Sequence, residues 1–377
     1  MEFRDLHAQY NALQDDIDRA INSVLASGRF IGGEAVTQLE RELEDYVGVK
    51  HCITCGNGTD ALQLALMAWG IGPGDAVIVP DFTFFSSGEV VSAVGATPVF
   101  VDVLEDTFNL DPAQIEPAVK LAKASGLNPR VVVAVDLFGQ PADYLAIRKE
   151  CEKFDLLLLE DGAQGFGGAI GDQKACSFGD ISTTSFFPAK PLGCYGDGGA
   201  IFTNNDEWAS LIQSYAVHGK GSMKYDNVRI GMNSRLDTIQ AAILRVKLKA
   251  FKLNELEDIN NVASNYSKML SGTCLELPKL RQGYFSSWAQ YTVQISESID
   301  RDDLKGFLDS QGIPTMIYYP KPMHNQEAFL KDSLCVGGCP VTLRLCKKVL
   351  SLPIGPYQAN NVLKVVDAAR LFLAAYN

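Results

Sequence analysis

Between residues 50 and 216, short runs of apolar residues alternate with longer stretches in which apolar positions recur at helical spacing. A short, wholly apolar run is typical of a strand buried on both faces, and an amphipathic stretch is typical of a helix that covers a sheet. Their alternation predicts an α/β fold with a mostly parallel central sheet and helices on both faces. The predicted strands are His51–Cys55, Ala76–Pro80, Thr97–Val103, Val131–Leu137, Leu156–Glu160, Ile181–Phe187 and Gly199–Thr203. The predicted helices include Thr59–Trp69, Pro112–Ala124 and Ala142–Phe154.

The pattern changes beyond residue 230. A long helical pattern runs from Asn233 to about Leu270, and either Asn233 or Ser234 is a suitable N-cap. Shorter mixed elements follow, so we expect a large α/β domain over residues 1–250 and a smaller α+β domain over residues 251–377. The elements expected in the smaller domain are a strand at Trp288–Ile295, a helix at Arg301–Gln311, a strand at Pro314–Tyr319 and a final helix from about Ala359.

Length and charge restrict the classes of protein to which this chain can belong. A chain of 377 residues is long enough for two domains. Its formal net charge of −12 disfavours a nucleic-acid-binding surface, which needs clustered Lys and Arg. No apolar run reaches the ~18 to 20 residues of a membrane-spanning helix. The charged start Met1–Asp5 lacks the apolar core of a signal peptide, so we expect a cytoplasmic protein with no membrane partner.

The nine cysteines are scattered, and in a cytoplasmic protein we expect them to be reduced. Cys52 and Cys55 form a C-x-x-C pair, and Cys335 and Cys339 form a C-x-x-x-C pair. Four thiolates could bind zinc. The pattern around Cys52 and Cys55 fits a short strand whose thiols pack in the core, so we expect no metal.

A glycine-rich turn follows the first predicted strand. In Gly56-Asn57-Gly58-Thr59, two glycines free the backbone just before an apolar helix begins. Backbone N–H groups and the positive end of that helix can hold a phosphate, and the Thr59 hydroxyl can donate to it. The spacing Gly56-x-Gly58-x-x-Ala61 also fits a loose dinucleotide fingerprint, so an NAD-dependent sugar oxidoreductase is an alternative. A plain tight turn is the structural alternative.

Two further segments carry chemistry at strand ends. Asp161 follows a run of four leucines, and an aspartate there can pair with the protonated ring nitrogen of pyridoxal phosphate. Lys190 follows the predicted strand Ile181–Phe187 within a Pro/Gly-rich loop, as a lysine that must reach a buried aldehyde would. Taken singly, Asp161 could cap a helix and Lys190 could be a solvated loop residue. Together with the phosphate turn, they indicate a pyridoxal 5'-phosphate (PLP) site.

These motifs resemble those of the DegT/StrS-type sugar aminotransferases, which are fold-type I PLP enzymes. The resemblance covers nearly the whole chain. Residues 186–202 are most similar to aminotransferases that act on UDP-2-acetamido-2-deoxy-3-oxo-glucuronate in surface-polysaccharide synthesis. The matching segments are Gly28–Gly33, Asn57–Leu62, Glu160–Gln164, Ser185–Lys190 and Gly231–Asp237.

The resemblance implies the roles of the catalytic residues. Lys190 would hold PLP as a Schiff base and move the proton during transfer. Asp161 would pair with the ring nitrogen and Gln164 would reach the ring hydroxyl. The amino donor would be L-glutamate and the acceptor a keto-sugar nucleotide.

The resemblance also implies how the cofactor is held. Gly58, Thr59 and Ser185 would bind its phosphate, and Phe84 would stack on its ring. Asn233 would reach the phosphate of the neighbouring subunit, which implies a homodimer with a shared active site.

Substrate recognition is predicted less specifically. Residues 192–200 follow a pattern similar to that of enzymes acting at carbon 3 of the sugar, with a dTDP-sugar or carbon 4 as alternatives. A uronate and glutamate are both anions, so Arg29 and Arg229 are candidate carboxylate partners, although each could equally pair with a surface acid. Tyr319 and His324 would line the sugar site by resemblance, and a structural histidine is the alternative. A non-catalytic scaffold with the same fold is the remaining alternative.

Overall fold

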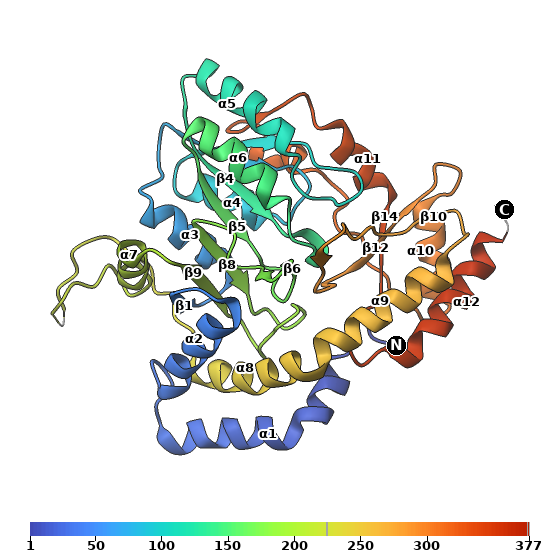
Figure 1. Ribbon diagram of the computed structural model, residues 1–377, viewed down its shortest axis with the longest axis horizontal. Helices are drawn as coiled ribbons and strands as arrows, with labels where there is room; N and C mark the ends of the chain where they lie inside the picture. The colour runs from blue at the N-terminus through green and yellow to red at the C-terminus, as the bar shows by residue number, and fades with distance from the viewer. Residues whose placement is uncertain (224, 375, 377) are drawn as a thin grey trace.

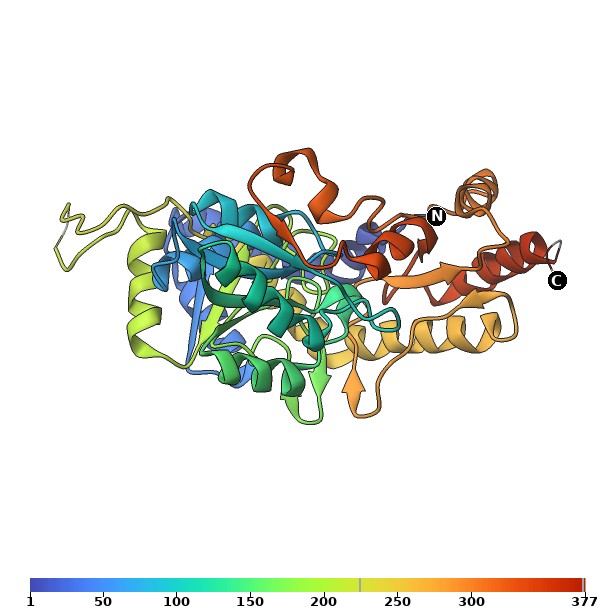
Figure 2. The same cartoon turned by 90° about the horizontal axis from the view of Figure 1, so that it is seen from above.

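The computed structural model describes residues 1–223, 225–374 and 376. Its centre is a sheet with helices on both faces, and a second body lies to one side of it, built from the C-terminal third of the chain (Figures 1 and 2). In the described residues the central sheet has eight strands in the order β1-β9-β8-β5-β4-β2-β3-β13. These are β1 (His51–Cys55), β2 (Asp75–Pro80), β3 (Thr97–Val101), β4 (Asn128–Val135), β5 (Leu157–Asp161), β8 (Ile181–Ser185), β9 (Gly199–Thr203) and β13 (Leu334–Cys335).

The strands of the central sheet run mostly parallel. β9 pairs antiparallel with both β1 and β8, whereas the pairs from β8 through β13 are parallel. The carboxyl ends of the parallel strands therefore share one edge of the sheet, which is where ligands bind in such sheets. All seven strands predicted from the sequence are present, so the predicted fold class is confirmed.

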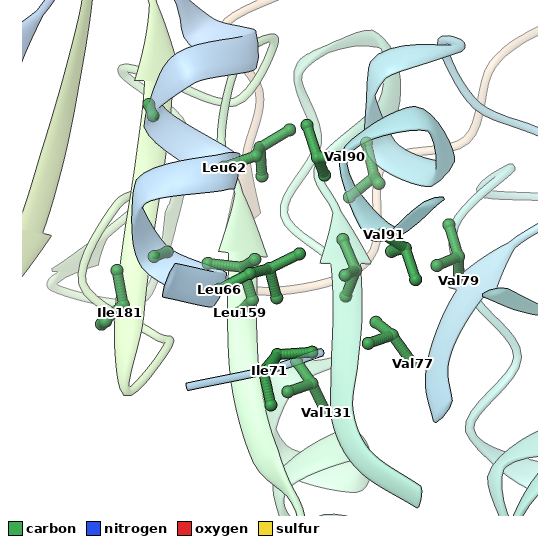
Figure 3. Packing of buried hydrophobic residues seen from close by; sticks show 14 of the residues in the cluster. Leu62, Leu66, Ile71, Val77, Val79, Val90, Val91, Val131, Leu159 and Ile181 are labelled. Carbon is green, nitrogen blue, oxygen red and sulfur yellow. The ribbon is translucent and has the colours of Figure 1, made fainter. Parts of the chain in front are cut away.

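Successive residues of a central strand face opposite sides of the sheet and therefore pack in two different hydrophobic cores. In β2, Val77 and Val79 belong to the core on one face, and Ala76 and Ile78 to the core on the other. The first face is covered by α3 (Gly58–Ala68), α4 (Ser86–Ala93) and α7 (Asp206–Ala216), and the second by α5 (Ile115–Ala124) and α6 (Tyr144–Phe154). Figure 3 shows side chains of α3 and α4 packed on the strands of the first face. Burial on both faces explains why these strands are apolar throughout.

The C-terminal body has its own core. An antiparallel sheet of β10 (Leu275–Glu276), β12 (Tyr291–Ile295) and β14 (Val349–Leu352) packs with α9 (Leu256–Leu270), α10 (Arg301–Ser310) and α12 (Val362–Leu373). α8 (Thr238–Ala250) leads into α9 through a π-helical turn at Phe251–Glu255. Figure 1 shows these helices running from the large sheet towards the C-terminal body, with α1 (Leu6–Ser27) beside α8.

Two predicted elements of this region are wrong. The long helix begins at Thr238 with Asp237 as its N-cap, not at Asn233 or Ser234. The Ser234 hydroxyl is engaged elsewhere, because it accepts the Gly56 N–H at 2.9 Å and donates to Asp60 at 2.6 Å. The chain around Asn233 is thereby tied to the start of α3 instead of coiling into a helix.

The predicted strand Pro314–Tyr319 is also absent. Only an isolated bridge joins Met316 to Ser351 in this stretch of the described chain. Pro314 has no N–H to donate to a ladder, and the chain then turns towards the large domain at Tyr318 and Tyr319.

Several elements were not predicted. They include α1, α2 (Glu34–Val47), α11 (Pro340–Lys348), the edge strand β13 and β14. In the described part of the chain, no helix combines the length and the apolar character needed to cross a bilayer.

Candidate active site

A cavity of about 640 Å³ opens at the carboxyl ends of the parallel strands. The start of α3, the turn after β2, the ends of β5 and β8, and the loop that carries Lys190 all reach it. The C-terminal body closes another side with Gln290, Tyr318 and Tyr319. The cavity therefore lies between the two parts of the molecule and collects residues from distant parts of the sequence. Of the predicted site residues, eight line it: Gly58, Thr59, Phe84, Asp161, Gln164, Ser185, Lys190 and Tyr319.

The start of α3 forms one end of the cavity. Asn57 caps the helix, because its side chain accepts the Asp60 N–H at 2.8 Å. The N–H groups of Gly58 and Thr59 lie in the first turn and have no acceptor within the helix. A Cβ on Gly58 would lie 2.7 Å from Cβ of Ser185, so only glycine lets helix and strand approach this closely. The Thr59 hydroxyl lies 2.7 Å from that of Ser86. Hydroxyls and free N–H groups thus converge where a phosphate can bind.

Asp161 and Lys190 line another part of the cavity. Asp161 is buried at the end of β5, where it accepts the Ser87 hydroxyl at 2.8 Å and the Ala163 N–H at 3.2 Å. Burial raises the pKa of Asp161, and the Ser87 hydrogen bond and the charge of Lys190 oppose that rise. Loss of hydration lowers the pKa of Lys190, opposed by the charge of Asp161. A half-buried amine with a lowered pKa is a better nucleophile than a solvated lysine.

The C-terminal body supplies polar and aromatic groups. The Gln164 amide N–H donates to the Tyr319 hydroxyl at 3.2 Å, and its carbonyl accepts the Phe138 N–H at 2.8 Å. The rings of Phe84 and Tyr319 have centroids 6.3 Å apart, and Phe84 is 52% exposed. Within the described residues, Oε1 of Gln290 is buried and has no hydrogen-bond partner. A buried acceptor without a partner is costly, and a donor on a bound ligand would satisfy it.

The residues present fit PLP. The free N–H groups and hydroxyls at α3 suit its phosphate, the buried Asp161 suits its ring nitrogen, and Lys190 suits its aldehyde. The exposed face of Phe84 and the small side chain of Ala163 leave room for a flat ring.

Four predicted site residues do not line this cavity. Asn233 and Arg29 are exposed, and Asn233 accepts a hydrogen bond from Arg235 at 2.6 Å. Arg229 lines a separate open cavity beside the segment after α7, where it contacts Ser214 and lies 5.5 Å from the ring centre of Tyr215. His324 is bonded to Asp81. The assignment of these four residues to cofactor or substrate stays a prediction.

Sequence reasoning missed several residues of the site. Ser86 and Ser87 begin α4 and come directly after the segment that contains Phe84. Their closeness in the sequence to a predicted site residue is a signal that could have identified them. Gln290 and Tyr318 carry no such signal, because they reach the cavity only through the packing of the C-terminal body.

The fold and the cavity define an aminotransferase of the PLP-dependent class. The chain belongs to the DegT/DnrJ/EryC1/StrS aminotransferase family, whose model matches residues 11–370. It is similar to the UDP-2-acetamido-2-deoxy-3-oxo-D-glucuronate aminotransferase of Pseudomonas aeruginosa, with 42% identity over 98% of this chain and 99% of the relative.

Solved structures agree with this family membership. A DegT/DnrJ/EryC1/StrS aminotransferase from Brucella abortus matches with a TM-score of 0.96 and 46% identity, covering 99% of both chains. NtdA from Bacillus subtilis, solved with bound cofactor PMP, matches with a TM-score of 0.84 and 30% identity over 95% of this chain and 82% of that one. The protein is a PLP-dependent enzyme, and the NAD-dependent and scaffold alternatives are set aside. The Gly56–Ala61 turn also follows an edge strand of the sheet rather than a central one.

Proposed function

We propose that this enzyme moves the amino group of L-glutamate onto a ketone at carbon 3 of a nucleotide sugar, with UDP-2-acetamido-2-deoxy-3-oxo-glucuronate as the first candidate. The printed activity of the Pseudomonas relative supports this substrate, and further relatives are also named for 3-amino sugars. The observation that carries the proposal is the convergence of Lys190, Asp161 and the start of α3 on one cavity. The product would serve surface-polysaccharide synthesis in the cytoplasm.

Each residue of the cavity then has a defined task. PLP, when bound, supplies an electron sink for the negative charge that develops at the reacting carbon. Asp161 keeps the ring nitrogen protonated, which maintains that sink. Lys190 would hold the cofactor through its Nζ, and the same amine would take a proton from one carbon of the substrate–cofactor unit and return it to another. The lowered pKa of Lys190 suits both tasks, because an unprotonated amine is needed for each.

The remaining residues orient cofactor and sugar. Gly58, Thr59 and Ser185 bind the phosphate, and Phe84 packs against the ring. Gln164, held between Phe138 and Tyr319, orients the ring hydroxyl. Closure of the cavity by the C-terminal body excludes water from the reacting atoms.

We propose in addition that the enzyme is a homodimer. The segment after α7 extends away from the rest of the molecule in both views (Figures 1 and 2). It exposes Met223 (68%), Val228 (55%) and Ile230 (90%), and exposed apolar residues in one patch are typical of an interface. Asn233 and Arg229 belong to the same region, so they can act in the partner's cavity although they lie outside their own. Arg29 is the other candidate for holding a carboxylate.

Absorption spectroscopy of the purified enzyme tests this function. We expect a band at ~410 to 430 nm that moves to ~330 nm when L-glutamate is added, as the cofactor passes to its amine form. A protein that stays colourless after PLP is supplied would contradict the assignment of Lys190. Offering 3-keto and 4-keto sugar nucleotides, each with UDP or dTDP, then identifies the acceptor. A restored long-wavelength band with only a 4-keto sugar would overturn the choice of carbon 3.

A dTDP-linked 3-keto sugar is the second candidate acceptor. A relative from Streptomyces venezuelae named as a dTDP-3-amino-3,4,6-trideoxy-glucose transaminase is 37% identical over 98% of this chain. The nucleotide series in the experiment above separates the two, because only the correct nucleotide should combine a low KM with a high kcat.

A further inference from the structure

A second cluster of reactive side chains lies outside the catalytic cavity, behind the turn that follows β2. Asp81, at the end of that strand, has a fully buried side chain. It accepts the backbone N–H of His324 at 2.8 Å, and its other oxygen lies 2.7 Å from Nδ1 of His324. The contact with Asp81 engages Nδ1, so Nε2 is the ring nitrogen left to bind a ligand.

Two cysteines complete the cluster. The sulfur atoms of Cys335 and Cys339 are 3.5 Å apart. A ring nitrogen of His324 and these two sulfurs all lie within 4.8 Å of one another. Between the cysteines, Gly337 and Gly338 adopt φ values of 60° and 72°, a left-handed turn that brings the two thiols close together. His324 is half-buried, Cys335 half-buried and Cys339 buried.

The spacing suits a thiolate-binding metal. In a tetrahedral zinc site, bonds of about 2.3 Å to sulfur and 2.0 to 2.1 Å to nitrogen put sulfurs about 3.8 Å apart and sulfur and nitrogen about 3.6 Å apart. The two sulfurs are already near this separation, and a small shift of the His324 ring closes the rest. A carboxylate bonded to the other ring nitrogen is the usual outer partner of a zinc-bound histidine, and with a metal on Nε2 the contact of Asp81 with Nδ1 would have that role.

We propose that His324, Cys335 and Cys339 bind one soft divalent metal ion, Zn²⁺ foremost, with water in the fourth position and Asp81 orienting the histidine. The three ligands do not line the catalytic cavity, and a metal on His324 would replace the contact with the sugar that the resemblance implies for this histidine. The site joins the turn Met323–Asn325 and the edge strand β13, which are close in the sequence, to the end of β2, where Asp81 lies 243 residues before His324. A metal here would hold the chain that follows Tyr319 against the large domain.

From the sequence, a zinc site is considered only for all four thiols of Cys52, Cys55, Cys335 and Cys339, and no metal is expected because Cys52 and Cys55 fit a buried strand. The structure separates these pairs, since β1 and β13 form opposite edges of the central sheet. A disulfide between Cys335 and Cys339 is the competing use of this pair. The metal is favoured because a third donor, held by a buried carboxylate, points to the same place.

Metal analysis of the reduced, PLP-loaded enzyme tests the proposal. After chelation and reloading with Zn²⁺, we expect about one ion per chain, and after reloading with Co²⁺ a thiolate-to-cobalt charge-transfer band. The variants Cys339→Ser and His324→Gln should lose the ion. Cys274→Ser, at a half-buried cysteine outside the cluster, should keep it. Asp81→Asn should weaken binding about 10- to 100-fold, as loss of an outer-sphere partner does.

Three results would overturn the site. Wild-type enzyme that binds no Zn²⁺ or Co²⁺ under reducing conditions would do so, and this measurement requires no variant to fold. Metal retained by both ligand variants would place it elsewhere. Peptide mass mapping that finds Cys335 and Cys339 joined in enzyme that binds no metal when reduced would show a redox pair instead.

Discussion

At the scale of single residues, Asp161 and Lys190 each influence the charge state of the other. Burial disfavours the charge of both, and each partly restores the charged form of the other. Ser87 adds a hydrogen bond to the carboxylate, which favours its charged form. The charge state of Asp161 thus depends on Ser87 as well as on Lys190.

Replacement of the lysine is the most direct test at this scale. Lys190→Ala should retain the fold but lose covalent cofactor, because no other amine is predicted to hold the aldehyde. Proton transfer should fall by at least about a hundredfold, the usual effect of losing a general acid–base group. Borohydride reduction followed by mass spectrometry checks the covalent link, and steady-state assays check the rate. Lys249→Ala, at an exposed lysine of α8, is the control and should behave as wild type.

Removal of the Ser87 hydroxyl should shift a pH dependence. The Ser87 hydrogen bond lowers the pKa of Asp161, so Ser87→Ala raises it. A hydrogen bond to a charged group contributes about 1.5 to 3 kcal/mol, so its loss should be large enough to move a measured pH dependence.

The carboxylate form of Asp161 is the form that binds the ring nitrogen. Affinity for PLP should therefore begin to fall at a higher pH in Ser87→Ala than in wild type as the solution is acidified. Equilibrium dialysis of apoenzyme across pH measures this, with Ser92→Ala, at an exposed serine of α4, as control. Identical pH profiles for the two variants would refute the role given to Ser87.

At the scale of elements, the start of α3 is the place where we propose that the phosphate of PLP binds. The helix begins directly after an edge strand, and its first turn packs on Ser185 of β8 at a distance that only glycine permits. The sequence indicated this turn because two glycines stand just before an apolar helix, although a dinucleotide fingerprint and a plain turn fitted the same residues.

Substitution of Gly58 tests that contact. Gly58→Ala should force helix and strand apart, lower the affinity for PLP and cost about 1 to 3 kcal/mol of stability, as overpacking does. Gly306 in α10 is a matched control, because a Cβ there meets no atom within 4 Å. Gly306→Ala should be neutral or stabilise by up to about 1 kcal/mol, the difference in helix propensity. Thermal unfolding with and without PLP distinguishes the two effects.

Elements whose identity depends on long-range contacts were predicted poorly. The stretch Asn233–Asp237 reads as the start of a helix, yet Ser234 bonds to Gly56 and Asp60, residues far away in the sequence. The helical pattern of the sequence continues through it, so local propensity could not reveal the break. β13 is too short to carry a pattern and exists because it pairs with β3.

At the scale of the whole molecule, we propose that a large domain of residues 1–250 and a small domain of residues 251–377 meet at the cavity. The core of the C-terminal body is formed by residues from α9 onwards, which supports the division. β13 nevertheless adds to the edge of the large sheet, and Met323 and Phe329 pack in its core. The boundary at residue 250 therefore divides the sequence, but some segments that follow it pack against the large domain.

Assembly can be tested at this scale. Ile230→Glu places a charge on the exposed segment after α7 and should convert a dimer into a monomer, because burying an unpaired charge in an interface is costly. Activity should fall with it if Asn233 and Arg229 act across the interface. Leu145→Glu, at a leucine of α6 that is 86% exposed, should leave the dimer intact. Light scattering coupled to gel filtration measures both. A monomeric wild type with full activity would contradict the shared site.

The sequence by itself determined seven of the eight strands of the large sheet that the structure describes, their mostly parallel character, and the identity of the residues at the strand ends. It could do so because burial on both faces requires apolar runs and because parallel strands bring their carboxyl ends to one edge. Only the tertiary structure decided which residues of different segments meet. These are Gln290 and Tyr319 in the cavity wall, Ser87 beside Asp161, and His324 beside Cys335 and Cys339. Spacing along a chain carries no information about such contacts, because the packing of α4 on the central sheet creates the Ser87–Asp161 contact and the packing of the C-terminal part of the chain on the large domain creates the others.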